Sequence, residues 1–137
     1  MRITQEADYA LRVVLYLSKV GYGNKVDAAT ISDSQRIPLR FLLKLLRKLV
    51  ASGIIISYRG KNGGYSLNKF PEEISIKNVV ESIDGPICLN RCILDPNYCT
   101  AKRAGKCEVH MVLEKVNRNL TSELEKINFE DLKNGKH

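Results

Sequence analysis

The sequence predicts a mostly α-helical fold with one small β-hairpin and a long C-terminal helix. Three observations favour this fold class. Apolar residues recur at three- and four-residue intervals in several segments, which is the spacing of amphipathic helices. A glycine-rich turn separates two short strand-like runs. The chain has 137 residues, 44% of them hydrophobic and 27% charged, which suffices for one domain with its own core.

The first expected helix spans residues 4–20. Thr4 can cap its N-terminus, and Glu6 and Asp8 lie in the first turn, where the helix dipole favours negative charge. Residues 21–24 should end the helix. The expected core-facing stripe consists of Ala7, Ala10, Leu11, Val14, Leu15 and Leu17.

A short helix over residues 28–35 is expected next. Asp27 is its N-cap, and Ala29 and Ile31 should face the core. A tight connection then leads into another helix, so the two form a helix-turn-helix arrangement.

The second helix of this pair is expected over residues 38–52. Pro38 should occupy its first position, and Gly53 should act as its C-cap. We expect four leucines to face the core and the basic residues to lie on another face. The leucines are Leu42, Leu45, Leu46 and Leu49, and the basic residues are Arg40, Lys44, Arg47 and Lys48.

Residues 54–69 are predicted to form a β-hairpin, with its turn at residues 59–64. Three glycines in the turn permit positive φ and close approach to another molecule. Arg59 and Lys61 lie at the expected tip, although a basic turn can also serve only solubility. A helix-turn-helix followed directly by a basic hairpin is the winged-helix arrangement. Its helix enters the major groove of DNA, and its hairpin contacts the backbone or the minor groove.

The excess of positive over negative charge is confined to this region. The chain carries a net charge of +7, and Ser34–Lys69 contains eight basic residues and no acidic ones. The rest of the chain has 14 basic and 15 acidic residues. A charge run is often only a solvated face, but the absence of acids here indicates an anion-binding surface.

Two more helices are expected after Pro71. A short one spans residues 75–83 and ends at Gly85. A long one of about five turns follows the cysteines. It can pack on its own domain or pair with a second chain, and we expect pairing, because helix-turn-helix proteins commonly bind DNA as dimers. Its apolar seam consists of Val109, Val112, Leu113, Val116, Leu120, Leu124 and Ile127.

The expected organisation has four parts. Residues 1–70 form the DNA-binding domain, and residues 71–107 form a connecting helix and a cysteine-rich loop. Residues 108–127 form the dimerisation helix. Residues 128–137 are expected to be a polar, frayed tail.

The segment from Cys88 to His110 holds all four cysteines, with the spacing C-x3-C-x6-C-x7-C-x2-H. Thiolates suit iron–sulfur clusters, zinc and Cu(I), and a disulfide switch between Cys88 and Cys92 is also consistent with the spacing. Structural zinc sites use short spacings, which Cys88 and Cys92 have but Cys99 and Cys107 do not. The residues alone leave these alternatives open.

Other classes of protein are disfavoured. The N-terminus lacks a secretory signal and no uncharged run could span a bilayer, so we expect a cytoplasmic protein with no membrane partner. In a reducing cytoplasm, clustered cysteines favour metal or redox chemistry. We expect no enzyme, because neither a nucleophile–base pair nor a phosphate loop is visible. An electron carrier would not need the basic helix and hairpin.

Four stretches of sequence together resemble one family: M-R-I-T-Q-E-A-D-Y-A-L-R, I-P-L-R-F-L-L-K-L-L, R-G-K-N-G-G-Y-S-L and C-E-V-H. The chain resembles, over about residues 1–127, the bacterial winged-helix transcription regulators that include the iron–sulfur assembly regulator (IscR-like) and the nitric-oxide-sensing repressor (NsrR-like). The resemblance implies a homodimer that binds a palindromic operator and holds a [2Fe–2S] or [4Fe–4S] cluster.

Carried over to this chain, the resemblance implies Cys92, Cys99 and Cys107 as cluster ligands. The fourth ligand is either His110 or Asp8 of the partner subunit. Cys88 precedes the family pattern and is an addition to it. The cluster would sense nitric oxide, redox state or iron and cluster supply.

The expected function is therefore a DNA-binding transcriptional regulator, acting as a repressor, whose operator binding depends on the cluster. The alternative is a winged-helix regulator without a cluster, which uses its cysteines as a thiol redox switch or a zinc site. The residues expected to contact double-stranded DNA are Arg36, Pro38, Leu39, Arg40, Lys44, Arg59, Lys61 and Asn62.

Overall fold

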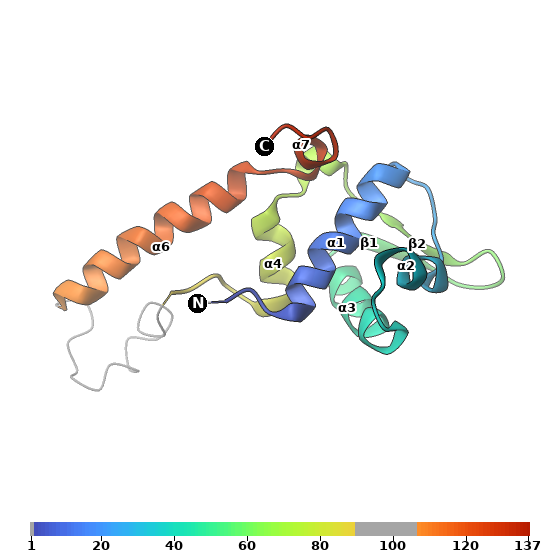
Figure 1. Cartoon of the computed structure of the whole chain (residues 1–137), viewed down its shortest axis with the longest axis horizontal. Helices are drawn as coiled ribbons and strands as arrows, with labels where there is room; N and C mark the ends of the chain where they lie inside the picture. The colour runs from blue at the N-terminus through green and yellow to red at the C-terminus, as the bar shows by residue number, and fades with distance from the viewer. Residues whose placement is uncertain (1, 90–106) are drawn as a thin grey trace.

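Helix α1 runs through the centre of the computed structural model, and most other elements pack around it (Figure 1). The structure describes residues 2–89 and 107–137. The described elements, in chain order, are α1 (Gln5–Val20), α2 (Ala28–Gln35), α3 (Leu39–Ala51), β1 (Ile55–Tyr58), β2 (Gly64–Leu67), the 3-10 helix η1 (Pro71–Glu73), α4 (Ile76–Asp84), α6 (Glu108–Lys126) and α7 (Phe129–Lys133).

Thr4 caps α1 as the sequence predicts. Its Oγ1 accepts a hydrogen bond from the Ala7 N–H at 3.1 Å and donates one to Asp84 Oδ1 at 2.5 Å, so the start of α1 is joined to the end of α4. The core face of α1 also includes Val13, which the predicted stripe omits. Leu11 and Leu15 are only half-buried.

Helix α2 begins at its predicted N-cap. The Asp27 side chain accepts a hydrogen bond from the Thr30 N–H at 2.7 Å, and this bond lowers the pKa of the Asp27 carboxyl. Ile31 is buried as expected, but the inward placement of Ala29 is wrong, because Ala29 is exposed and Ala28 is the half-buried alanine. Residues three apart share a helix face, so Ala28 accompanies Ile31.

Helix α3 differs from the prediction only at its ends. Pro38 is the N-cap and not the first helical residue, and Ser52 is the C-cap, followed by Gly53 at φ 82°. The four leucines predicted to face the core are each 0% exposed. Amphipathic spacing therefore predicts this helix and its buried face correctly.

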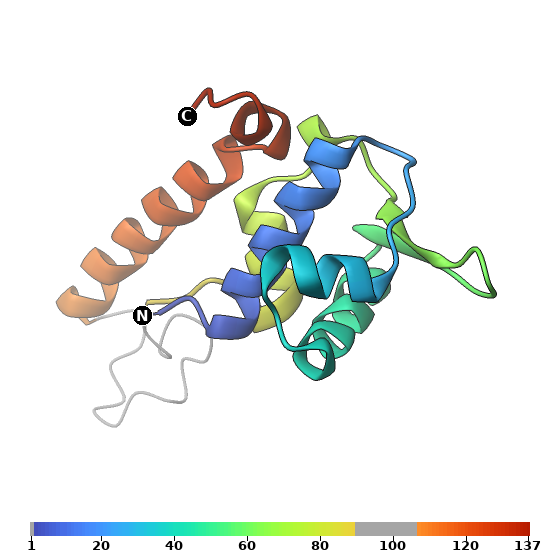
Figure 2. The same ribbon diagram turned by 45° about the vertical axis from the view of Figure 1, so that its right-hand side comes forward.

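The hairpin has the predicted position. Strands β1 and β2 are antiparallel, with Ile55 opposite Leu67 and Tyr58 opposite Gly64. An isolated bridge between Val26 and Tyr65 joins β2 to the segment before α2. The turn of the hairpin projects beyond the rest of the molecule (Figure 2).

The expected frayed tail is wrong. Phe129 is 0% exposed and belongs to the core cluster, and α7 is a short helix capped by Asn128. The Phe129 N–H donates to the Ile74 carbonyl at 3.0 Å, and the Ile76 N–H donates to the Ile127 carbonyl at 3.0 Å. Phe129, the partly buried Leu132 and a pair of backbone hydrogen bonds thus hold this polar segment against η1, α1 and the start of α4.

Helix α6 extends away from the body of the molecule (Figure 1). Its apolar seam is divided lengthwise into two edges. Leu113, Leu120 and Leu124 are half-buried, whereas the valines of the other edge are exposed. The three exposed valines are Val109, Val112 and Val116.

Candidate nucleic-acid interface and cysteine segment

The outward side of α3 is basic and exposed. Because the leucines face the core, Arg40, Lys44 and Arg47 project from the opposite side of the helix, at four- and three-residue spacing. All eight residues expected to contact DNA are exposed: Arg36, Pro38, Leu39, Arg40, Lys44, Arg59, Lys61 and Asn62. They come from the turn before α3, from the first half of α3 and from the hairpin turn. The hairpin turn is separated from the start of α3 by the rest of that helix and by β1.

The turn between α2 and α3 is held by a reciprocal pair of hydrogen bonds. The Ile37 N–H donates to the Ser32 carbonyl at 3.1 Å, and Ser32 Oγ donates to the Ile37 carbonyl at 2.6 Å. Arg36 occupies the left-handed region, with φ 53° and ψ 48°. This backbone conformation reverses the chain after α2 and determines where α3 begins.

Arg12 of α1 braces the same turn. Its Nη1 donates to the Gln35 carbonyl at 3.3 Å, and its guanidinium lies 4.7 Å from the centre of the Tyr9 ring. A cation at the C-terminal end of a helix also interacts favourably with the helix dipole. Arg12 therefore positions α2 relative to α1, a role that its sequence context does not reveal.

A carboxylate from another part of the chain lies beside the basic face. Glu6 Oε1 is 2.7 Å from Lys48 Nζ, and Glu6 Oε2 is 3.8 Å from Lys44 Nζ. From the sequence, Glu6 was expected only to interact with the helix dipole of α1. Since Glu6 and Lys48 are far apart in the chain, only the packing of α1 on α3 could reveal this pairing.

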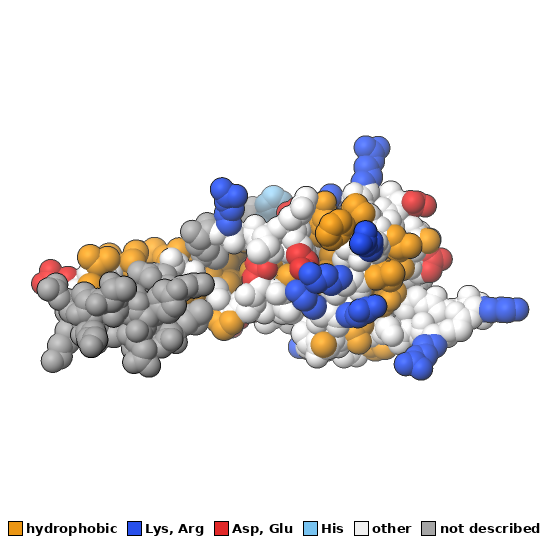
Figure 3. Space-filling view, turned by 90° about the horizontal axis from the view of Figure 1, so that it is seen from below, with side chains coloured by type: hydrophobic (Ala, Val, Ile, Leu, Met, Phe, Trp, Pro, Cys, Tyr) orange, Lys and Arg blue, Asp and Glu red, His pale blue; other side chains and the backbone are white. Residues whose placement is uncertain are grey.

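The hairpin presents its basic residues at the same side of the molecule as α3. Arg59, Lys61 and Asn62 are exposed in the turn between β1 and β2. Figure 3 views the molecule from the side on which α3 lies, and Lys and Arg side chains are spread among hydrophobic ones from this face to the projecting end. The arrangement suits a polyanion long enough to meet both elements.

The cysteine segment is described only at its two ends. The predicted ligands Cys92 and Cys99 lie outside the described residues. Cys107 is half-buried and is the N-cap residue of α6, and Cys88 is half-buried too. Within residues 2–89 and 107–137, no three His, Cys, Asp or Glu residues form a group that could hold a metal ion.

The two candidates for the fourth ligand differ in their surroundings. His110 lies one turn after Cys107, and its side chain is 14% exposed. Its Nε2 is 3.6 Å from Glu114 Oε2, and its buried Nδ1 has no hydrogen-bond partner among the described residues. Asp8 is on α1, with Oδ2 3.8 Å from Arg12 Nε, and both views place the start of α6 away from α1.

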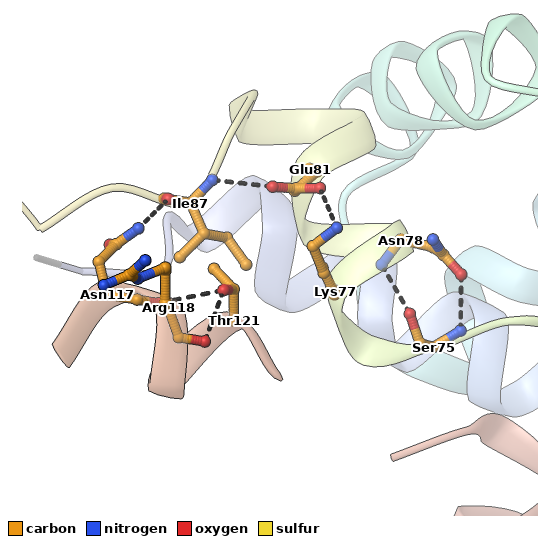
Figure 4. Close-up of polar contacts among 8 residues, drawn as sticks. All are labelled: Ser75, Lys77, Asn78, Glu81, Ile87, Asn117, Arg118 and Thr121. Atoms are coloured by element: carbon orange, nitrogen blue, oxygen red, sulfur yellow. Dashed lines mark hydrogen bonds and ion pairs between the residues drawn. The ribbon is translucent and has the colours of Figure 1, made fainter. Parts of the chain in front are cut away.

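The chain entering the cysteine segment is held by two helices (Figure 4). The Ile87 N–H donates to Glu81 Oε2 of α4 at 3.0 Å. Asn117 of α6 donates from Nδ2 to the Ile87 carbonyl at 3.1 Å and accepts at Oδ1 from the Leu89 N–H at 2.9 Å. Lys77 pairs with Glu81 at 3.3 Å. The backbone on both sides of Cys88 is thereby attached to α6.

Asn117 was not among the residues predicted from the sequence. It is the buried polar residue of α6, and it occupies the same helix face as Leu113 and Leu120. The sequence does contain a signal for it, namely a polar residue within an apolar seam. A buried amide nearly always forms hydrogen bonds, commonly to backbone groups.

Comparison with known proteins decides the family. Residues 3–135 match the Rrf2 family of iron-dependent transcriptional regulators. The chain belongs to the Rrf2 family. A protein of Rhodobacter capsulatus named as an rrf2-like HTH-type transcriptional regulator is 34% identical over 138 residues, covering 95% of this chain and 91% of the relative. The HTH-type transcriptional regulator IscR of Pectobacterium atrosepticum is 29% identical over 136 residues, covering 99% and 81%.

Solved structures share the fold of this Rrf2-family chain. The global cysteine regulator CymR of B. subtilis superimposes with a TM-score of 0.77 at 23% identity, covering 100% of this chain and 99% of that one. The T. potens IscR superimposes with a TM-score of 0.74 at 20% identity, covering 100% and 89%. The winged helix-turn-helix prediction is confirmed.

Family membership also establishes the general activity. The chain is a DNA-binding transcriptional regulator and not an enzyme, as the sequence predicted. Among the described residues, no helix is long and apolar enough to cross a membrane. The two structural neighbours bear different names, a cysteine regulator and IscR, so likeness of fold alone does not select the signal.

Proposed function

We propose that this chain is a cytoplasmic, homodimeric Rrf2-family repressor that binds a palindromic operator and is controlled by an iron–sulfur cluster. The observation that carries the DNA-binding part is the exposed basic side of α3 together with the basic hairpin on the same side of the molecule. In this arrangement α3 enters the major groove, and Arg59, Lys61 and Asn62 contact the backbone or minor groove.

The dimer is supported by the exposed edge of α6. Val109, Val112 and Val116 lie on one stripe, and Val112 is 62% exposed. A second copy of α6 would remove these side chains from water. Two-fold pairing through α6 would place two α3 helices for half-sites about 34 Å apart, one turn of the DNA helix.

The cluster assignment rests on the resemblance to iron–sulfur regulators, and the donor set is compatible with it. Cys92, Cys99 and Cys107 would supply three thiolates, which suit iron–sulfur clusters. The fourth ligand would be His110, whose buried Nδ1 lacks a partner among the described residues, or Asp8 of the partner subunit. In a cluster with a non-cysteine ligand, one iron is open to attack by nitric oxide or oxygen and is more easily lost.

Asn117 and Glu81 connect the cysteine segment to helices that contact the DNA-binding side of the molecule. They hold residues 87–89 to α6 and α4, and α4 packs on both α1 and α3. A conformational change in the cysteine segment would therefore shift α6 and, through α4, also α3. Because both half-sites must be met at once, a small shift between the two α3 helices weakens binding strongly.

The test uses protein purified without oxygen. Iron and acid-labile sulfide are measured, and affinity is determined for duplexes enriched from a random pool, before and after cluster removal. We expect stoichiometric iron and sulfide and at least about a tenfold difference in affinity, the range typical of allosteric coupling. Equal affinity of the two forms would overturn cluster control. Separate exposure to nitric oxide, oxygen and an iron chelator identifies the signal.

A thiol switch or zinc site is the second candidate. It is favoured by Cys88, which lies outside the family pattern yet is held in place through Ile87 and Leu89. Colourless protein with one zinc per chain, or an affinity that follows the thiol state without iron, would favour this alternative. The proposed DNA-binding role would remain in either case.

A further inference from the structure

The outward side of α3 has an unusual set of side chains. Besides the basic residues, it carries exposed Leu39 (45%), Phe41 (60%) and Leu43 (37%). Leu39 and Leu43 are four residues apart and therefore lie one above the other, beside the row formed by Arg40, Lys44 and Arg47. Phe41 lies on the other flank, where it lines a pocket together with Gln5, Glu6 and Tyr9 of α1. Hydrophobic and basic side chains are interspersed over this face (Figure 3).

The chemistry of α3 limits what it can recognise in a major groove. From Leu39 to Ala51 the helix has no Asn, Gln, Asp, Glu, Ser or Thr. Asn and Gln are the residues that pair with adenine, and Glu and Asp accept from cytosine. What remains is Arg or Lys for guanine, and apolar side chains for the C5-methyl group of thymine.

We propose that Leu39 and Leu43 are specificity-determining residues that contact thymine methyl groups in the operator half-site, next to guanines bound by the neighbouring basic residues. The inference rests on the proposed function, since it places α3 in the major groove. The half-site is thus recognised through adjacent thymine and guanine. The leucines lose water contact when the groove covers them, and a base without the methyl group leaves that space unfilled.

Phe41 is not part of this proposal. It lines a pocket with residues of α1 and with Lys44, on the flank of α3 away from the two leucines.

The test removes single methyl groups from the DNA. Duplexes enriched by the full-length protein are remade with each thymine replaced in turn by deoxyuridine, which keeps the base pair and the O4 acceptor. Affinity is measured at one fixed salt concentration. We expect a loss of about fourfold for each contacted methyl group. In Leu39→Ala or Leu43→Ala protein, the penalty at the matching thymine should disappear.

Phe70→Ala serves as the control, because Phe70 is a 48% exposed aromatic residue outside α3. It should keep every deoxyuridine penalty. Circular dichroism checks that the variants are folded, as expected for exposed positions.

The failures can be told apart. If wild-type protein binds an enriched duplex but no deoxyuridine substitution changes its affinity, the methyl readout is wrong and the proposed function stands. If penalties occur but persist in both leucine variants, other residues read the methyl groups. If no duplex is enriched over competitor DNA, the proposed function itself fails.

Discussion

Among the residues that the structure describes, Arg36 is the one non-glycine residue with a positive φ. It stands at the C-cap of α2, where glycine is most common, and a side chain with a Cβ is strained in this conformation. Arg36 is also one of the residues expected to contact DNA. A strained backbone position and an exposed guanidinium thus coincide in the turn that leads into α3.

Replacing Arg36 by Gly should separate these two properties. The free energy of unfolding should rise by about 1 kcal/mol, because the left-handed conformation costs glycine little. DNA affinity should fall by about 1–3 kcal/mol through loss of the guanidinium. Urea unfolding and DNA titration measure the two effects. Arg36→Lys keeps both the positive charge and the backbone strain, so it should change neither the free energy of unfolding nor the DNA affinity greatly. Unchanged DNA affinity in the glycine variant would show that Arg36 is not part of the interface.

Glu6 acts at the same scale by restraining two cations of α3. Glu6→Gln should release Lys44 and Lys48 for phosphate contact, while keeping the shape of the side chain. Affinity for non-specific DNA should rise at low salt, and the slope of log affinity against log salt should steepen by about one unit. Glu72→Gln, on η1, is the matched control and should leave the slope unchanged. An unaltered slope in Glu6→Gln would mean that the pairing does not limit DNA contact.

At the scale of elements, α7 completes the core from the end of the chain. Phe129 of α7 packs in the same cluster as Ile74 and residues of α1. The Phe129 N–H also donates a hydrogen bond to the Ile74 carbonyl. The polar sequence around it conceals this, because only Phe129 and the partly buried Leu132 supply the packing. The element is short but is part of the domain and not an appendage.

Phe129→Ala should therefore destabilise the fold by about 3–5 kcal/mol, the cost of emptying a fully buried aromatic site. Thermal or urea unfolding measures the change. Phe70→Ala removes an aromatic ring of equal size from the surface, where it stacks on Tyr22 at 4.3 Å, and should cost about 1 kcal/mol or less. Similar losses in the two variants would show that α7 contributes no more than a surface contact.

At the scale of the whole molecule, the two edges of α6 lie in different surroundings. One edge packs toward the body and holds residues 87–89 through Asn117, and the other exposes three valines. Packing on its own domain and pairing with a second chain are therefore compatible. The helix adjoins the cysteine segment at Cys107, so assembly and sensing would share it.

Val112→Glu should convert the proposed dimer into a monomer without unfolding it. A carboxylate in the centre of a valine stripe cannot be buried against a second copy without a large desolvation cost. Sedimentation velocity gives the mass, and affinity for a two-half-site duplex should fall at least about a hundredfold as the second module is lost. Ser122→Glu places the same charge on an exposed position of α6 off the stripe. If it disrupts assembly equally, the valines are not the interface.

The sequence by itself determined the winged helix-turn-helix, the caps at Thr4 and Asp27 and the buried leucines of α3. These depend on spacing and local hydrogen bonds, which a chain carries wherever it folds. Tertiary structure alone decided the pairing of Glu6 with Lys48, the burial of Phe129 and the attachment of residues 87–89 by Asn117. Each of these joins residues distant in sequence, and their approach follows from how whole helices pack, which no local pattern encodes.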